Sequence, residues 1–287
     1  SDGTASAILN YNYRVIKYGS NGAQLWSATY DGPAANDDIV QDIALSPSGE
    51  VLVTGYSDAA SSIAIQNDMV SILYSPTGSV TWTKIYAGAA GKDDEAAACT
   101  FDTQGKAWIA GHTEDNLARR DAYLVQYDAQ GNAVSSSVWN GFGDNSDNVR
   151  ETVVDNAGNI YLCGYAVGKD TDRDMFVCKL TSNGDTLWTR RLSGTLFGSD
   201  EEANAIALDN SNNVIISGYT KNSGTGSDIT LIKYSTTGNL LWTTQFNGTA
   251  NESDRSYDLA TDAQGNIYIT GKTDINSSPI IINDEIF

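Results

Sequence analysis

Cysteine, histidine and methionine are scarce in this chain. Its 287 residues include 3 Cys, 1 His and 2 Met. Three cysteines do not make a disulfide scaffold at this length. Cys163 and Cys178 lie on consecutive predicted strands, where either a cross-strand bond or two buried thiols would fit, and Cys99 is interpreted as a small core residue. The single His112 takes a slot that other repeats fill with tyrosine, so it is interpreted as an aromatic substitute rather than a ligand.

Positively charged residues are also few. The chain has 17 Lys and Arg against 36 Asp and Glu, which gives a net charge of −19. Affinity for a phosphate backbone comes from clustered Lys and Arg, so we expect no nucleic-acid partner. The acidity fits solubility through self-repulsion, and the alternative is attraction of divalent cations.

Long apolar runs are missing. No segment approaches the roughly 18 residues that a membrane span needs, so we expect no membrane span. The start at Ser1 lacks the basic residues and apolar run of a signal peptide, which fits a start after a removed leader as well as a cytosolic origin. The motifs of a serine nucleophile elbow and of a phosphate loop are missing too.

What the chain does have is a repeat. A segment rich in β-branched and aromatic residues, such as D-I-T-L-I-K-Y at 228–234, recurs about every 54 residues. Such enrichment between turn residues predicts a β-strand. A repeat of this length, divided into four short strands, is typical of a propeller blade. The copies of this segment end at Tyr18, Tyr74, Tyr127, Leu180 and Tyr234.

Four strands per repeat follow from the pattern. The first is rich in small residues, which suits the crowded axis of a propeller, and a D-x-x-G-N turn such as 155–159 leads into the second. The second strand ends at a glycine in every copy, which predicts close backbone approach or a bulge. The third is the segment described above. The fourth carries a Trp that Ser135 replaces in one copy, so we interpret the Trp as packing between blades.

The order of the strands predicts the architecture. The chain opens with a third and a fourth strand at 12–30, contains four complete repeats, and ends with a first and a second strand at 255–273. We therefore predict an all-β, five-bladed propeller of four-stranded antiparallel blades, one domain over 1–287, in which 12–30 and 255–273 pair to close the ring. Residues 274–287 are a tail or an extra edge strand. Alternatively, 279–283 is itself the third strand, in which case the repeats belong to a longer array.

The sequence resembles the SBBP-type β-propeller repeats. The likeness is carried by Y-D-G-P-A-A-N-D-D-I-V-Q-D-I-A-L-S-P-S-G-E-V-L-V-T-G-Y-S at 30–57 and D-I-T-L-I-K-Y-S-T-T-G-N-L-L-W at 228–242, and it extends over nearly all of the chain. Repeats of this family occur in secreted and cell-surface bacterial proteins, and no general activity is established for them. The resemblance implies a propeller fold and a secreted or cell-surface location, and it leaves the activity open.

The repeats provide an internal comparison that separates scaffold from site. A residue present in every copy serves the blade, whereas a residue found in one or two copies is free to serve a site. An acidic position just ahead of the first strand is present in all copies, which fits a carboxylate that accepts backbone N–H bonds in a tight loop. The alternative is a ring of carboxylates that binds Ca²⁺, although no copy has the spacing of a dedicated calcium loop. These metal candidates are Asp38, Asp94, Asp147, Glu201 and Asp254.

Residues that differ between copies mark a second candidate site. Two neighbouring slots near the start of the first strand hold Ala in some repeats and charged or aromatic residues in others. If these strands line the axial opening, their side chains converge there on a ligand, and three carboxylates could support general acid–base chemistry on a glycosidic bond. The alternative is that they only line a water-filled channel. The ligand-binding candidates are Asp42, Arg150, Glu151, Arg255, Tyr257 and Asp258.

Two functional classes remain open. The first is a non-catalytic propeller, secreted or at the cell surface, that binds a protein or a glycan, mediates adhesion or serves as a structural module of a larger surface assembly. It is favoured because the repeats are regular and no catalytic set is recognised. The second is a carbohydrate-active hydrolase that uses Asp42, Glu151 and Asp258. Apart from Ca²⁺, we expect no cofactor.

Overall fold

The computed structural model describes a chain built from strands alone. The described residues are 10–34, 36–58, 66–88, 91–143, 145–168, 172–196, 198–274 and 284–286. Four sheets in this part of the chain have four strands each, and two smaller sheets contain the first and the last strands. Within the described residues, no helix has the length and apolar character needed to cross a membrane.

Each four-stranded sheet corresponds to one complete repeat, with its strands paired antiparallel in chain order. We call these sheets blades 1 to 4. Blade 1 contains β3 (Asp38–Leu45), β4 (Val51–Asp58), β5 (Asn67–Tyr74) and β6 (Val80–Tyr86). Blade 2 contains β7 (Asp94–Phe101), β8 (Ala107–Glu114), β9 (Arg120–Tyr127) and β10 (Ala133–Trp139). Blade 3 contains β11 (Asp147–Val154), β12 (Ile160–Val167), β13 (Arg173–Leu180) and β14 (Thr186–Leu192). Blade 4 contains β15 (Glu202–Leu208), β16 (Val214–Asn222), β17 (Gly226–Tyr234) and β18 (Leu240–Phe246).

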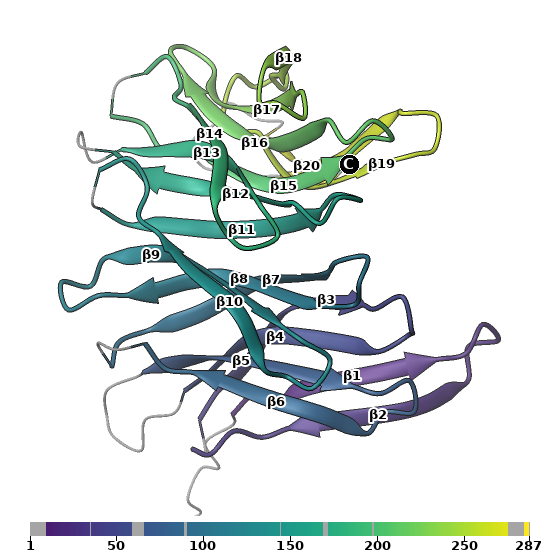
Figure 1. Ribbon diagram of the computed structural model, residues 1–287. Helices are drawn as coiled ribbons and strands as arrows, with labels where there is room; N and C mark the ends of the chain where they lie inside the picture. Colours follow the sequence, from purple (N-terminus) through teal and green to yellow (C-terminus); the bar gives the residue numbers. More distant parts are fainter. Residues whose placement is uncertain are drawn as a thin grey trace, which may run out of the picture.

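The two smaller sheets lie at opposite ends of the row of blades (Figure 1). The N-terminal hairpin consists of β1 (Tyr13–Tyr18) and β2 (Gln24–Tyr30). The C-terminal sheet consists of β19 (Arg255–Thr261), β20 (Ile267–Asp274) and β21 (Asp284–Ile286). The first strands of successive sheets contact one another along the row, from β3 through β7, β11 and β15 to β19. The first strands, which are rich in small side chains, therefore lie along the inner side of the row of blades, as predicted.

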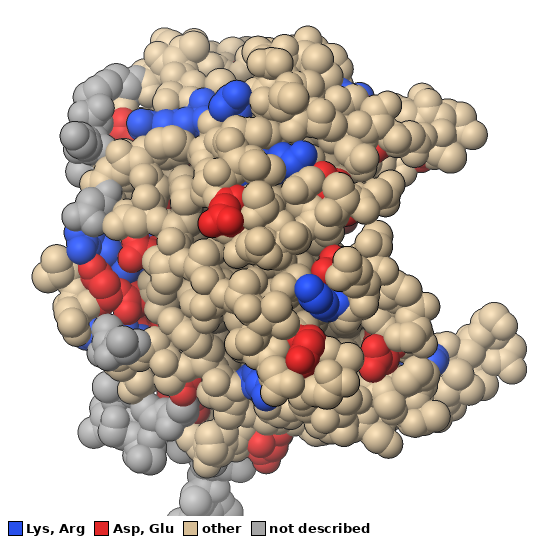
Figure 2. Space-filling view, in the orientation of Figure 1, with Lys and Arg blue, Asp and Glu red and all other residues tan. Residues whose placement is uncertain are grey.

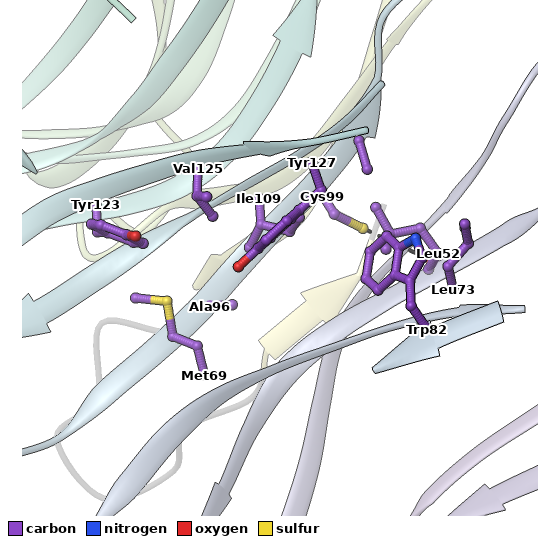
Figure 3. Packing of buried hydrophobic residues seen from close by; sticks show 11 residues of the cluster. Leu52, Met69, Leu73, Trp82, Ala96, Cys99, Ile109, Tyr123, Val125 and Tyr127 are labelled. Atoms are coloured by element: carbon purple, nitrogen blue, oxygen red, sulfur yellow. Dashed lines mark hydrogen bonds between the residues drawn. The ribbon is translucent and has the colours of Figure 1, made fainter. Parts of the chain in front are cut away.

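Blades pack face to face through their second and third strands. These strands are apolar almost throughout and are buried on both faces, whereas the fourth strands β6 and β18 are largely exposed. Figure 3 shows the core between blades 1 and 2, where Met69, Leu73 and Trp82 lie opposite Ile109 and Tyr127. The Trp82 and Tyr127 rings are 5.6 Å apart between centroids. The predicted packing role of this Trp is confirmed.

The glycine predicted to end each second strand lies within that strand, opposite a β-bulge. The register of strand pairing skips one residue in every first strand, at Gln41, Ala97, Arg150, Asn204 and Tyr257. Here the backbones approach so closely that a Cβ on Gly218 would lie 1.9 Å from the carbonyl oxygen of Glu202. The predicted bulge is confirmed, and it turns the skipped side chain away from its neighbours.

The predicted closing blade is not formed. The third-strand position on β20 is occupied by β21, because Thr273 pairs with Glu285 as Thr220 pairs with Asp228 in blade 4. β1 instead packs at the other end of the row, where Tyr13 is buried in the core of blade 1. The expectation that 12–30 and 255–273 share a sheet is therefore wrong in this structure. An added edge strand after residue 274 is present at 284–286, and 279–283 lies outside the described residues.

Exposure at the two ends follows from this arrangement. Ile16 of β1 is 40% exposed, whereas Ile72 and Ile232 in the same slot of complete blades are 1% exposed. Tyr268 of β20 is 59% exposed, whereas its counterpart Ile215 is fully buried. Figure 2 shows the surface hollowed on one side between the lower and the upper blades. The described strands thus form a row of blades with exposed sheet faces at both ends.

Cys163 and Cys178 are free thiols on different faces of blade 3. Cys163 pairs with Val177 while Cys178 pairs with Leu162, so the two lie one residue out of step and point to opposite faces. Cys163 is buried against blade 4 and Cys178 against blade 2. No disulfide is formed between them, and the alternative of two buried thiols is confirmed.

Candidate functional site: a pocket between blades 2 and 3

The acidic position at the start of the first strands accepts a backbone N–H of the loop that leads from the preceding sheet into that strand. Asp38 accepts the N–H of Gly32 at 2.8 Å, and Asp254 accepts that of Gly248 at 2.6 Å. A Cβ on Gly32 would lie 2.5 Å from Asp38 Oδ1, so the glycine lets the carboxylate approach. The predicted scaffold role is confirmed.

The carboxylates at this position are not gathered in one place in the described part of the chain. Within the described residues, no three His, Cys, Asp or Glu side chains lie together in a way that could hold a metal ion. The carboxylates are buried in separate loops, at 0% exposure for Asp94 and 1% for Asp147. Burial raises the pKa of Asp147 to about 7. The calcium ring considered from the sequence is therefore not supported by Asp38, Asp94, Asp147, Glu201 and Asp254.

Two of the predicted axial carboxylates link neighbouring blades. Asp42 of blade 1 accepts the backbone N–H of Cys99 in blade 2 at 2.8 Å. Glu151 of blade 3 accepts that of Ile206 in blade 4 at 2.7 Å. Both follow a bulge directly, which aims them across the boundary between blades. At least one oxygen of each carboxylate is thus already used by the fold.

The third predicted carboxylate lies at the end of the row. Asp258 is exposed and accepts only the N–H of its neighbour Leu259, at 2.7 Å, among the described residues. Burial raises the pKa of Glu151 to about 7, and the charges of Asp258 and Asp42 contribute to the rise. The charges of Asp42 and Asp258 thus act on Glu151. Tyr257 beside them is 54% exposed.

The predicted arginines belong to a different set of contacts. Arg150 forms an ion pair with Glu202 of blade 4, and Glu202 also accepts the hydroxyl of Tyr219 at 3.2 Å. The guanidinium of Arg255 lies over the Tyr219 ring, 4.4 Å from its centroid. Among the described residues, neither Arg150 nor Arg255 forms an ion pair with the predicted carboxylates Asp42, Glu151 and Asp258. Arg150 directly precedes Glu151 in β11, and Arg255 is the first residue of β19.

Similar side-chain contacts bridge each boundary between blades at this level. Asn67 of blade 1 donates to Glu95 of blade 2 at 3.0 Å. Asn148 of blade 3 contacts His112 of blade 2 at 3.3 Å. Between blades 2 and 3 the contacts leave a pocket of about 280 Å³. We call it the blade 2–3 pocket, and its lining residues are Gln41, Glu95, Ala96, Ala97, His112, Arg120, Asn148, Arg150, Tyr165 and Arg173.

His112 is a neutral hydrogen-bond donor in this pocket. It is 2% exposed, and burial together with the charges of Arg120 and Arg150 lowers its pKa to about 3. The amide nitrogen of Asn148 can only donate, so Nδ1 of the imidazole accepts and the proton lies on Nε2. Nε2 has no hydrogen-bond partner among the described residues, and Glu95 Oε2 is 3.9 Å away. A buried N–H is therefore left for a ligand.

Three guanidinium groups line the pocket in a chain that is strongly acidic overall. Arg120 pairs with Glu114 at 3.2 Å, and Arg150 pairs with Glu202. Arg173 forms no ion pair among the described residues and lies over the Tyr165 ring, 4.5 Å from its centroid. The Arg173 guanidinium thus has no acidic partner among the described residues, while Glu95 contributes a carboxylate to the same pocket. The free guanidinium favours an anionic group.

Sequence reasoning selected Arg150 and missed the residues around it. The interpretation of His112 as an aromatic substitute describes its packing, but its imidazole also contacts the next blade. The comparison between repeats does mark His112 as exceptional, because Tyr56, Tyr165 and Tyr219 fill the same slot in other repeats. Arg120 and Arg173 likewise stand at the start of a third strand where blades 1 and 4 have Asn67 and Ser227.

The repeat matches a known family in part of the chain. Residues 241–277 match the SBBP β-propeller repeat. A curated relative, the uncharacterized WD repeat-containing protein L264 of Acanthamoeba polyphaga mimivirus, is 23% identical over 90% of this chain. The chain spans 20% of the length of that relative.

Solved structures show the same fold at low sequence identity. A protein of unknown function from Bacteroides caccae has a TM-score of 0.52 and 13% identity, over 92% of this chain and 84% of its own. Another from Dyadobacter fermentans has a TM-score of 0.50 and 8% identity, over 86% of this chain and 78% of its own. These similarities concern the fold and carry no activity.

Proposed function

We propose that this β-propeller with an SBBP repeat is a non-enzymatic binding module that holds a partner, a protein or a glycan, at the blade 2–3 pocket. One observation carries the proposal. The pocket is lined by His112, Arg120 and Arg173, which differ from repeat to repeat, and it presents a buried Nε2–H without a partner among the described residues. Residues that the fold does not require are free to serve recognition.

The hydrolase alternative has weaker support. A glycosidase needs an acid and a second carboxylate that both face the substrate. Asp42 and Glu151 each accept a backbone N–H of the next blade, at 2.8 and 2.7 Å, so a structural role accounts for both. The raised pKa of Glu151 follows from burial. Binding therefore explains the arrangement with fewer assumptions than catalysis.

We place the module outside the cell, secreted or on the cell surface and within a larger surface assembly. The support is the resemblance to SBBP repeats, which occur in such bacterial proteins. The acidic composition, with a net charge of −19, fits a soluble exposed module as well.

The test is binding of the labelled protein to arrays of glycans and of candidate surface proteins, together with Arg173→Gln and Arg14→Gln variants. Arg173 is exposed and lines the pocket, whereas Arg14 is exposed on the N-terminal hairpin and serves as the control. We expect the first variant to lose the bound features and the second to keep them. Binding that both variants retain equally would contradict the proposal. Release of sugar by wild type but not by Glu151→Gln would establish the hydrolase instead.

A further inference from the structure

We propose that the blade 2–3 pocket recognises a monoanionic sugar residue, a uronate or a sulfate ester, with its negative group on Arg173 and His112 Nε2–H. The inference rests on the proposed function and specifies its ligand. It draws on the balance of charge, on the donors and acceptors left open in the pocket, and on the size of the pocket.

The charged groups of the pocket leave a place for one negative group on the ligand. Arg120 and Arg150 already have acidic partners in Glu114 and Glu202. Of the three arginines in the pocket, only Arg173 is without an ion pair among the described residues. A dianion would need a second free cation, and it would also meet the carboxylate of Glu95 on the pocket wall. A carboxylate or a sulfate ester matches one guanidinium fork.

The free hydrogen-bonding groups require an acceptor and a donor on the ligand. His112 Nε2–H needs an acceptor, which the anionic group supplies. Glu95 Oε1 accepts from Asn67 at 3.0 Å, while Oε2 lies 3.9 Å from His112, beyond hydrogen-bond distance. Oε2 can therefore accept a proton from the ligand. A sugar hydroxyl provides that donor beside an acidic group.

A hydroxyl suits this place better than an ammonium group. Arg173 has no ion pair among the described residues, and a positive charge on the ligand would be repelled by its guanidinium group. This argues against a zwitterionic amino acid, which would otherwise match the same donor and acceptor. A hydroxyl is uncharged and is therefore not repelled by the guanidinium groups.

The size and the walls of the pocket favour one sugar unit. Its volume is about 280 Å³, below the range of about 300 to 1,000 Å³ for sites that enclose drug-sized molecules. The only apolar side chains on its wall, apart from the edge of Tyr165, are those of Ala96 and Ala97. A hydroxyl-rich residue at the end or side of a glycan fits such a wall, whereas an apolar peptide side chain would leave the polar groups unpaired.

Isothermal titration calorimetry of the full chain tests the inference. The probes are D-galacturonate, D-galactose 6-sulfate, D-galactose, D-galactose 6-phosphate and L-serine. We expect one of the two monoanionic sugars to bind at least about tenfold more tightly than galactose, the phosphate and serine. Comparison of the affinities for D-galacturonate and D-galactose 6-sulfate shows whether the pocket prefers a carboxylate or a sulfate ester. Equal affinity for galactose, or preference for the phosphate or serine, would overturn the inference.

Two variants assign the interaction to the pocket. Arg173→Gln should weaken the acidic sugar at least about tenfold and leave galactose unchanged. Arg14→Gln is the matched control and should bind as wild type does. Unchanged affinity in Arg173→Gln would also overturn the inference. Should the arrays show pocket-dependent binding to a neutral glycan or a protein while both acidic sugars fail in the calorimeter, the binding module stands and its acidic ligand does not.

Discussion

His112 and Asn148 face each other across the boundary between blades 2 and 3, with Nδ1 of the imidazole 3.3 Å from the amide nitrogen. Both side chains are buried, at 2% and 5% exposure. The contact sets the imidazole tautomer, because an amide N–H can only donate. A slot that tyrosine fills in other repeats therefore holds a neutral hydrogen-bond donor here, and this residue lines the blade 2–3 pocket.

Replacement of either partner should cost stability, and the two costs should not add. His112→Phe leaves the buried Asn148 amide unpaired, and Asn148→Leu leaves Nδ1 unpaired, so each should lower the free energy of unfolding by about 1 to 3 kcal/mol. The double variant removes both polar groups and should lose less than the sum. Urea unfolding of the four proteins measures this cycle. Strictly additive losses would show that the two residues are not coupled.

Glu151→Gln should make stability less dependent on pH. Burial raises the pKa of Glu151 from its usual value to about 7. A carboxyl that holds its proton more tightly in the folded state stabilises the fold at low pH, and this stability is lost as pH rises through about 7. The amide keeps the bond from Ile206 without a charge. The variant should therefore match wild type near pH 4.5 and exceed it by up to about 3 kcal/mol near pH 8.

Denaturant unfolding at the two pH values measures this difference between the proteins. Asp147 and His112 titrate in both, so their contributions cancel in the comparison. A difference that is the same at both pH values would contradict the buried, protonated Glu151. Loss of binding in this variant, with stability unchanged, would instead connect Glu151 to a ligand.

The tryptophans of the fourth strands should differ in importance according to whether a neighbouring blade covers them. Trp82 is 7% exposed and packs over the turn at Gly131, whereas Trp242 in blade 4 is 36% exposed. Trp82→Ala should lower the free energy of unfolding by about 3 to 5 kcal/mol. Trp242→Ala should cost less than about 1 kcal/mol. Similar losses for both variants in urea unfolding would mean that blade 4 is covered in solution.

The cysteines should be unreactive in the folded protein. All three are free and buried, and burial raises the pKa of Cys178 to about 11. A thiol reagent should therefore label none of them in native buffer near pH 8 and all three after unfolding. Rapid native labelling, or only one reactive thiol after unfolding, would contradict the described packing of Cys163 and Cys178.

The strands could be predicted from the sequence, but the pairing at the two ends of the chain could not. Apolar runs and glycines predict the four-stranded blades and the bulge, because both depend on contacts within a repeat. Closure depends on which segment occupies the edge of β20. Asn12 and Glu285 both fit the third-strand slot, and the structure pairs Thr273 with Glu285. A strand pattern alone does not distinguish between two compatible partners.

The site was only partly predictable for a similar reason. Arg150 was found because its slot varies between repeats, from Ala97 in one to Arg150 in another. The meaning of His112 depends on Asn148, which belongs to the next repeat and is adjacent only after the blades pack. Asp42 and Glu151 show the reverse error, because their exceptional positions are explained by backbone N–H groups of the next blade.

The most direct test of the account is nitrogen-15 NMR of His112. The chain has 1 His, so one imidazole signal reports on the blade 2–3 pocket in tag-free protein. We predict a neutral ring protonated at Nε2 between about pH 5 and pH 8, with Nε2 shifting when the acidic sugar that binds in the calorimeter is added and staying unmoved with galactose. A ring that titrates near its ordinary pKa of about 6.5, or an Nε2 signal that the acidic sugar leaves unchanged, would contradict the account.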